Sequence, residues 1–539
     1  MAGSTLLTLL FAAGVAFIYY LIPSRFRWVV LLVASAVFYV SAQPLLFMLL
    51  VAEAVWTWFA STKIEGARHP KRWLVAGIVP AVLCLFVFKY LNFFCDSVTS
   101  FLNSLGLAVD PFTILLMMPL GISYYTFKCI SSLADVYTQK IQTNRHVGHF
   151  LAYVLFFPQI LCGPIQRASD FLPQIKEPAF DKMLCLQGFQ LFIRGLFKKI
   201  VIANQLLPYV DQVYANYAAY SGLALFMSAF FYSVLIYCDF SGYSDIAIGM
   251  SNIFGLRCPQ NFNAPYFARN IRDFWNRWHI SLSSWLRDYI YIPLGGSRCS
   301  NRRRIYNLMV TFLVSGLWHG ASWSFVAWGG IHGIWNALTP RTNKRRALQV
   351  DLLPKAISMD AEMAKQGALS ARVELQPIEP IVKNVPITLR NENGLDDHEL
   401  TKQGDVIKQN ANLLRRSWAD RLKLIIYTLL TFSGVSVAWI FFRAPDLSVG
   451  AHYIWRMITK FSLSIASIEQ MLLVFRGDST SVTLFLTIML MILMLAVYEW
   501  RRVYIKDRKL LSVPWMVFML VSILLFGSFG ASKFLYANF

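Results

Sequence analysis

The chain has 539 residues, of which 56% are hydrophobic, 15% aromatic and only 15% charged, and its mean hydropathy is +0.49. A soluble domain carries about 25% charged residues, so this composition excludes an ordinary soluble protein and predicts a chain that crosses a membrane several times. The net charge of +21 does not indicate nucleic-acid binding, because the basic residues lie mainly in short segments between apolar runs, as in the cytoplasmic loops of membrane proteins.

The apolar runs predict an all-α, polytopic membrane protein with about 11–13 membrane segments, some of them re-entrant. We expect these segments at 5–23, 27–42, 44–60, 73–94, 112–136, 148–165, 185–207, 222–254, 305–319, 321–338, 421–443, 481–500 and 514–531. The first has no Lys or Arg before its apolar stretch, so we expect a retained helix and not a cleaved signal peptide. The run at 148–165 contains Pro and Gly residues and is a candidate for a re-entrant segment.

The run at 222–254 is too long for one straight span and contains two carboxylates, Asp239 and Asp245. We expect one crossing plus a shorter buried piece. Carboxylates in an apolar region need partners, so both are expected to pair with Arg or Tyr. Glu53, a lone carboxylate in the third span, is expected to face the protein interior.

The charge pattern also predicts topology and domain organisation. Loops with several Lys and Arg residues are expected in the cytoplasm, whereas 96–111 has none and is expected outside, together with both termini. Residues 1–340 form the predicted membrane core. Residues 341–420 are a predicted hydrophilic cytoplasmic insertion. Residues 421–539 are predicted C-terminal spans, with an amphipathic outer-surface segment at about 444–480.

The string NIRDFWNRWHISLSSWLRDYIYIPLGG begins at Asn270 and is polar, aromatic and basic. At about 100° per residue it predicts one amphipathic helix, with His279 at the border of the faces and arginines on the polar side. Such a helix suits the membrane interface. Its aromatic and apolar face is formed by Trp275, Trp278, Leu282, Trp285, Leu286 and Tyr289.

The string SGLWHG places His319 near the middle of an apolar run, 305–338. This run is long enough for two crossings of about 17 residues each, so the Trp318-His319-Gly320 triplet is expected at a break between two helices. An ionisable residue there is a functional candidate, because its desolvation must be compensated. The alternative is a core histidine that bonds a backbone carbonyl.

Both strings, together with FFPQILCGPIQR at 156–167 and YCDFSGYSDIAIG at 237–249, resemble the membrane-bound O-acyltransferase (MBOAT) family. The resemblance covers most of residues 1–340 and resumes at VAWIFFRA, 437–444. It implies helices that enclose a central tunnel or funnel with His319 at its waist.

The resemblance implies O-acyl transfer in a bacterial inner membrane. The acyl group is expected to be acetyl, donated by a cytoplasmic thioester such as acetyl-coenzyme A, with no bound cofactor. The acceptor is expected to be an exported polysaccharide, with alginate first, or a periplasmic acetyltransferase partner. The alternatives are acyl transfer to cellulose or peptidoglycan, D-alanyl transfer to teichoic acid, and a transporter without acyl chemistry.

By this resemblance His319 is the catalytic base and His279 the second, less defined site residue, which orients the donor, shares the proton or holds its helix in place. Asn276, Arg277 and Trp318 are candidates for the donor path. Arg277 suits a donor phosphate but equally suits lipid head groups. No metal site is expected, because the two histidines lack a third and fourth ligand. The eight cysteines contain no CxxC pair, so neither a zinc site nor a disulfide framework is expected.

Overall fold

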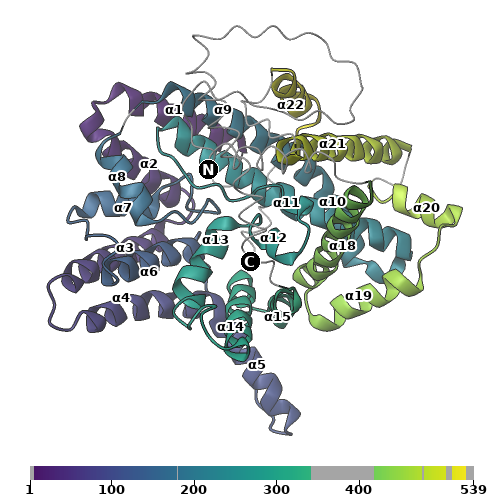
Figure 1. The fold of residues 1–539 in the computed structure, drawn as a ribbon, viewed down its shortest axis with the longest axis horizontal. Coiled ribbons are helices and arrows are strands. Elements are labelled where there is room, and N and C mark those ends of the chain that lie inside the picture. Colours follow the sequence, from purple (N-terminus) through teal and green to yellow (C-terminus); the bar gives the residue numbers. More distant parts are fainter. Residues whose placement is uncertain (1–4, 179, 341–417, 476–478, 505–512, 530–539) are drawn as a thin grey trace, which may run out of the picture. The chain divides into compact units, whose positions relative to one another are not determined.

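Every regular element in the described part of the chain is a helix (Figure 1). This computed structural model describes residues 5–178, 180–340, 418–475, 479–504 and 513–529. Five of the described helical stretches are long and apolar enough to cross a membrane by themselves, namely Pro44–Ile64, Pro70–Ser104, Gly222–Ile253, Leu422–Arg443 and Thr480–Tyr504. The predicted all-α, multi-pass membrane protein is therefore confirmed. The expected insertion at 341–420 lies almost entirely outside the described residues.

The first group of helices contains α1 Thr5–Leu21, α2 Arg27–Val40, α3 Pro44–Ile64, α4 Pro70–Leu85, α5 Leu91–Ser104, α6 Ile122–Tyr137, α7 Val147–Leu155 and α8 Ala168–Lys176. A 3₁₀ turn, Ser24–Phe26, precedes α2, and a π-helix, Phe86–Tyr90, joins α4 to α5. Proline occupies the first position of α3 and α4, where no hydrogen bond is lost. The nine residues of α7 are too few to cross a bilayer.

The second group contains α9 Lys182–Leu196, α10 Asn204–Ala215, α11 Gly222–Ile253, α12 Ile271–Trp275, α13 Ile280–Leu286, α14 Asn301–His319, α15 Trp323–Leu338, α18 Trp418–Arg443, α19 Leu447–Thr459, α20 Ile465–Leu472, α21 Ser479–Tyr504 and α22 Val513–Phe526. π-Helices at Phe197–Ala203 and Arg287–Tyr291 join α9 to α10 and extend α13, and 3₁₀ turns lie at Tyr217–Ala219 and Pro265–Phe267.

Helix α11 is one continuous helix of 32 residues, so the expected division of 222–254 into two pieces is wrong. Its carboxylates do not interrupt it because both are paired with cations. Asp245 accepts from Arg194 at 2.8 Å and from Lys198 at 3.0 Å, which confirms the predicted arginine partner. Asp239 pairs with Lys199, where Arg or Tyr was expected.

Helices α9 and α11 approach closely through paired glycines. A Cβ at Gly188 would lie 2.7 Å from the carbonyl oxygen of Gly249, and a Cβ at Gly195 would lie 2.5 Å from that of Gly242. Both pairs are seven residues apart along their helices, so they repeat along one line of contact. Small residues at such a line allow close backbone packing in membrane proteins.

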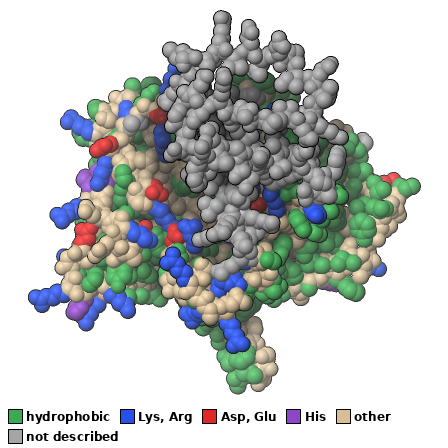
Figure 2. All heavy atoms as spheres, viewed as in Figure 1, with side chains coloured by type: hydrophobic (Ala, Val, Ile, Leu, Met, Phe, Trp, Pro, Cys, Tyr) green, Lys and Arg blue, Asp and Glu red, His purple; other side chains and the backbone are tan. Residues whose placement is uncertain are grey.

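The described helices bury two large apolar clusters. One is formed mainly by α1–α4, α6–α8 and the end of α11, and the other mainly by the second group of helices together with part of α6. Glu53 is buried, as expected, and accepts a hydrogen bond from Thr126 of α6 at 3.1 Å. Figure 2 shows Lys and Arg side chains gathered where α7, α8 and the turn between α3 and α4 lie, whereas the surface over α19 and α20 is mainly hydrophobic.

Candidate active site

The two expected helices around SGLWHG are α14 and α15, and α14 ends at His319. Gly320 follows in an extended conformation. The two helices contact through small residues, since a Cβ at Gly316 would lie 2.3 Å from the carbonyl oxygen of Phe325, and a Cβ at Gly329 would lie 2.4 Å from that of Phe312. The helix break that the sequence predicts is therefore present, and it places His319 at the C-terminal end of a helix.

The side chain of His319 is enclosed by aromatic rings. The residue is only 2% exposed. Its ring centroid lies 4.9 Å from that of Trp318, 5.1 Å from that of Trp328 and 5.2 Å from that of Phe442. Phe442 belongs to α18, which follows the 341–417 segment in sequence. The imidazole is thus held in a water-poor environment inside the protein.

His279 lies at a break between α12 and α13, so the expectation of one continuous amphipathic helix is wrong. Its backbone is left-handed, with φ 43°. The cause is Asn261, whose main-chain oxygen accepts from the N–H of Ile280 at 2.9 Å and whose Oδ1 accepts from the N–H of Ser281 at 3.2 Å. These contacts take two N–H groups that a continuous helix would use internally.

The aromatic face expected at the membrane interface packs inside the protein. Trp278 is 0% exposed, and Trp275, Leu282 and Trp285 are also buried. The tryptophan ring of Trp285 stacks on Phe127 of α6 at 3.7 Å. The periodicity of apolar residues correctly predicted which face is buried. Neighbouring helices, and not lipid, cover that face.

The imidazole of His279 is completely buried, and burial lowers its pKa to about 3. The ring is therefore neutral at physiological pH. Its Nδ1 lies 3.1 Å from Oδ1 of Asn261, which fixes the proton on Nδ1 because that oxygen is an acceptor. Within the described residues no hydrogen-bond partner lies at Nε2.

One tryptophan links the two histidines. The ring of Trp318 lies 5.9 Å from that of His279 and 4.9 Å from that of His319, measured between centroids. Its ring also lies near the rings of Phe127 and Tyr124 of α6, at centroid distances of 5.5 and 5.7 Å. Residues 40 positions apart in sequence are thereby brought into one aromatic cluster.

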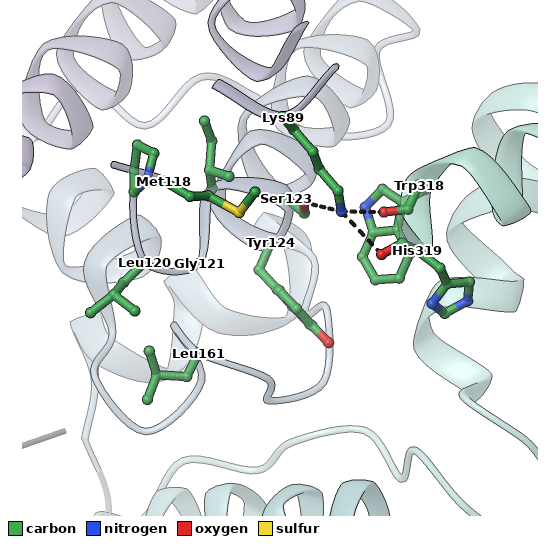
Figure 3. A pocket seen from close by; sticks show the side chains of 11 residues that line it. Lys89, Met118, Leu120, Gly121, Ser123, Tyr124, Leu161, Trp318 and His319 are labelled. Carbon is green, nitrogen blue, oxygen red and sulfur yellow. Dashed lines mark hydrogen bonds between the residues drawn. The ribbon is translucent and has the colours of Figure 1, made fainter. Parts of the chain in front are cut away.

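A cavity of about 80 Å³ lies beside the end of α14 (Figure 3). Figure 3 shows Lys89 aimed at the carbonyl oxygens of Trp318 and His319, with the His319 imidazole on the far side of these oxygens. Gln43 fixes one wall, because its amide bonds Met118 O and Leu120 N at 3.0 and 2.8 Å. The complete lining consists of Lys89, residues 118–124, Leu161, Trp318 and His319.

Two of the candidates for the donor path lie away from this cluster. Asn276 is exposed. Arg277 forms an ion pair with Asp273 one helical turn earlier, at 2.7 Å. Trp318, the third candidate, is in the cluster. Among the described residues, no group of three or more His, Cys, Asp or Glu side chains gathers as metal ligands would.

Four residues of this region were not predicted from the sequence: Lys89, Ser123, Tyr124 and Asn261. A signal existed for Lys89, which stands alone in a long apolar run, and an ionisable residue in such a run marks a functional candidate. Asn261 gave no comparable signal, because its role depends on a contact with residues about 20 positions later.

The helical architecture and the buried histidine pair define a multi-pass membrane protein with an enclosed, aromatic-lined site. The chain belongs to the MBOAT, membrane-bound O-acyltransferase family, whose sequence pattern matches residues 43–338. Both histidines and Lys89 fall inside this match.

Named relatives share this region. The chain is 39% identical over 345 residues to a protein of Azotobacter vinelandii named "Probable alginate O-acetylase AlgI", covering 63% of this chain and 67% of the relative. It is 36% identical over 337 residues to a peptidoglycan O-acetyltransferase of Helicobacter pylori, covering 57% and 63%. It is 31% identical over 226 residues to a teichoic acid D-alanyltransferase of Bacillus subtilis, covering 40% and 57%. The named relatives are all O-acyltransferases.

Proposed function

We propose that this protein transfers an acetyl group from acetyl-coenzyme A in the cytoplasm to an acceptor on the outer side of a bacterial inner membrane. The acceptor is a hydroxyl of an exported polysaccharide, with alginate first, or a periplasmic acetyltransferase partner that modifies the polymer. The higher identity to alginate O-acetylases than to teichoic acid D-alanyltransferases supports this choice. The basic loops support the membrane orientation.

His319 acts as the general base in this proposal. Its imidazole removes the proton of the acceptor hydroxyl, and the oxygen attacks the thioester carbonyl carbon. The carbon–sulfur bond then breaks, the coenzyme A thiolate leaves and takes up the proton, and an ester remains on the acceptor. General-base action of this kind contributes about 10²- to 10⁴-fold to the rate, and it requires a neutral imidazole, which an aromatic enclosure favours.

His279 shares this cluster through Trp318, and we assign it the donor side. Its neutral ring is held by Asn261 at Nδ1, and Nε2 has no hydrogen-bond partner among the described residues. The ion pair with Asp273 favours a structural role for Arg277 over phosphate binding. Asn276 is exposed, so it remains a candidate only for contact with a donor at the protein surface.

One observation carries the proposal: two buried histidines, each at the end of a broken helix, meet on the same tryptophan ring beside a cavity. Membership of an acyltransferase family argues against the transporter alternative.

The test compares two histidines of the same aromatic cluster. His319→Gln should reduce acetyl transfer by at least about 10²-fold, measured as release of coenzyme A and as ester formation on alginate oligosaccharide. His332→Gln is the matched control, because His332 is also completely buried and its ring centroid lies 4.8 Å from that of Trp328. Equal transfer by wild type and His319→Gln would overturn the proposal.

Assays with alternative donors and acceptors identify the two substrates. Transfer from D-alanyl carrier-protein thioester but not from acetyl-coenzyme A would favour the teichoic acid alternative. Transfer from acetyl-coenzyme A to cellulose or peptidoglycan fragments but not to alginate would keep the chemistry and replace the polymer.

A further inference from the structure

Lys89 is a buried lysine beside the end of α14. It lies in the π-helix Phe86–Tyr90, inside the membrane-spanning stretch Pro70–Ser104, and is 8% exposed. No carboxylate of the described residues lies within ion-pair distance of it. Its three N–H groups instead match three oxygens: Trp318 O at 2.5 Å, His319 O at 3.4 Å and Ser123 Oγ at 3.4 Å (Figure 3).

The two carbonyl oxygens belong to the last two residues of α14. The final carbonyls of a helix have no partner within the helix, and the helix dipole makes this end partly negative. An ammonium group placed there satisfies the carbonyls and gains its own charge compensation from the dipole. Lys89 is therefore bound to the main chain of the residue to which the proposed function assigns the base.

We propose that Lys89 is a positioning residue for His319, an inference that rests on the proposed function. The last turn of a helix frays when its carbonyls are unsatisfied. Gly320, which follows directly, restricts the backbone little and does not prevent this fraying. Lys89 holds this turn against α4 and α5, so the imidazole keeps the position from which it reaches the acceptor hydroxyl. A displacement of about 1 Å in a reacting group can cost about 10²-fold in rate.

The chain offers a matched control in Lys128 of α6. It is 2% exposed and also donates to a carbonyl oxygen, that of Tyr153, at 2.9 Å. Its partner belongs to α7 and not to the helix that carries His319. Loss of Lys128 thus removes a buried lysine of similar environment without releasing the end of α14.

The experiment measures kcat and KM for acetyl-coenzyme A with purified full-length protein and alginate oligosaccharide. Lys89→Met should lower kcat about 10- to 100-fold and leave KM within twofold, because it displaces the base and not the donor. Lys89→Arg, which keeps the charge and the donors, should recover most of the loss. Lys128→Met should keep kcat within about threefold of wild type at equal amounts of folded protein.

Lys89→Gln repeats the test with a polar side chain that lacks the charge, so the comparison stands if the methionine variant does not fold. The inference is overturned if Lys89→Met or Lys89→Gln is folded with wild-type kcat, or if Lys128→Met loses as much kcat as they do. A wild-type protein that transfers no acetyl would instead overturn the proposed function. If His319→Gln loses activity while Lys89→Met and Lys89→Gln retain it, only the role of Lys89 is overturned.

Discussion

The backbone at His279 is left-handed, a conformation that asparagine and glycine tolerate better than histidine. The surrounding contacts supply the stabilisation, with Asn261 on one side and the rings of Phe240 and Trp318 at 4.6 and 5.9 Å on the other. The sequence identified His279 as a candidate through the family resemblance of the string around it. It did not predict the backbone break, because the residue that causes the break is 18 positions earlier.

The buried, neutral ring of His279 predicts sensitivity to acid. Between about pH 6.5 and 3 the unfolded chain binds a proton at this ring that the folded protein excludes. Stability from this residue is therefore complete above pH 6.5 and falls as the pH falls, by up to about 1.4 kcal/mol per pH unit. His279→Asn tolerates the left-handed backbone, so the variant should lose less thermal stability than wild type between pH 7.5 and 5.

Thermal unfolding in detergent at the two pH values measures this difference. The control is His452→Asn, which changes an exposed histidine and should follow the wild-type dependence. The same loss of stability in wild type and His279→Asn would contradict the assigned effect of burial.

At the scale of elements, the α14–α15 hairpin was predicted correctly because its signals are local. An apolar run of the length of two helices, interrupted by a polar triplet with glycine, is visible in the sequence alone. The extent of α11 was predicted wrongly, and the break within 270–292 was not predicted. Both depend on partners distant in sequence, Lys199 and Arg194 for α11 and Asn261 for the break.

The contact between α14 and α15 predicts a sharp difference between adjacent glycines. Gly329→Ala would bring a methyl group to 2.4 Å from the carbonyl oxygen of Phe312, and the backbone must move apart. Such overpacking costs about 1–3 kcal/mol, so the melting temperature should fall and acetyl transfer should fall with it, because His319 ends the displaced helix.

Gly330→Ala is the control for this variant. Its Cβ would meet only the Leu313 side chain, at 3.8 Å, and alanine has a higher helix propensity than glycine. Thermal unfolding of both variants should therefore give a lower midpoint for Gly329→Ala and an unchanged or raised midpoint for Gly330→Ala. Equal midpoints would mean that the helices have room to separate at this point.

At the scale of the whole molecule, a buried ion network joins helices that are far apart in sequence. Asp245 of α11 binds Arg194 of α9 and Lys198 of the following π-helix, and Lys198 lies 3.7 Å from Glu499 of α21. All these side chains are at most 10% exposed. The network extends to α21, which lies beyond the 341–417 segment in sequence.

Asp245→Asn removes the carboxylate that pairs with buried Arg194 and leaves Lys198 with only the more distant Glu499. Breaking a buried pair in this way costs about 3–5 kcal/mol, so the variant should unfold at a clearly lower temperature or yield little folded protein. Arg257→Ala is the control, because the Arg257 side chain, although paired with Asp181, is 72% exposed. Exposed pairs contribute little, so a similar loss in both variants would contradict the importance of burial.

The sequence predicted the class of fold and most of the helices, and it singled out both histidines as candidates, since these follow from local patterns and family strings. It did not predict which segments meet at the site. Lys89, Asn261 and Phe442 contact the two histidines from three other parts of the chain, and Ser123 binds Lys89. Such long-range contacts depend on tertiary packing, which no local period encodes.

The covering of His319 by Phe442 has a consequence for biosynthesis. Phe442 follows His319 by 123 residues, which a ribosome adds in about 6–25 s at about 5–20 residues per second. During that interval the nascent chain already contains α14 but still lacks the ring that closes one side of its terminal imidazole. The aromatic enclosure of His319 can therefore be completed only well after α14 has been synthesised.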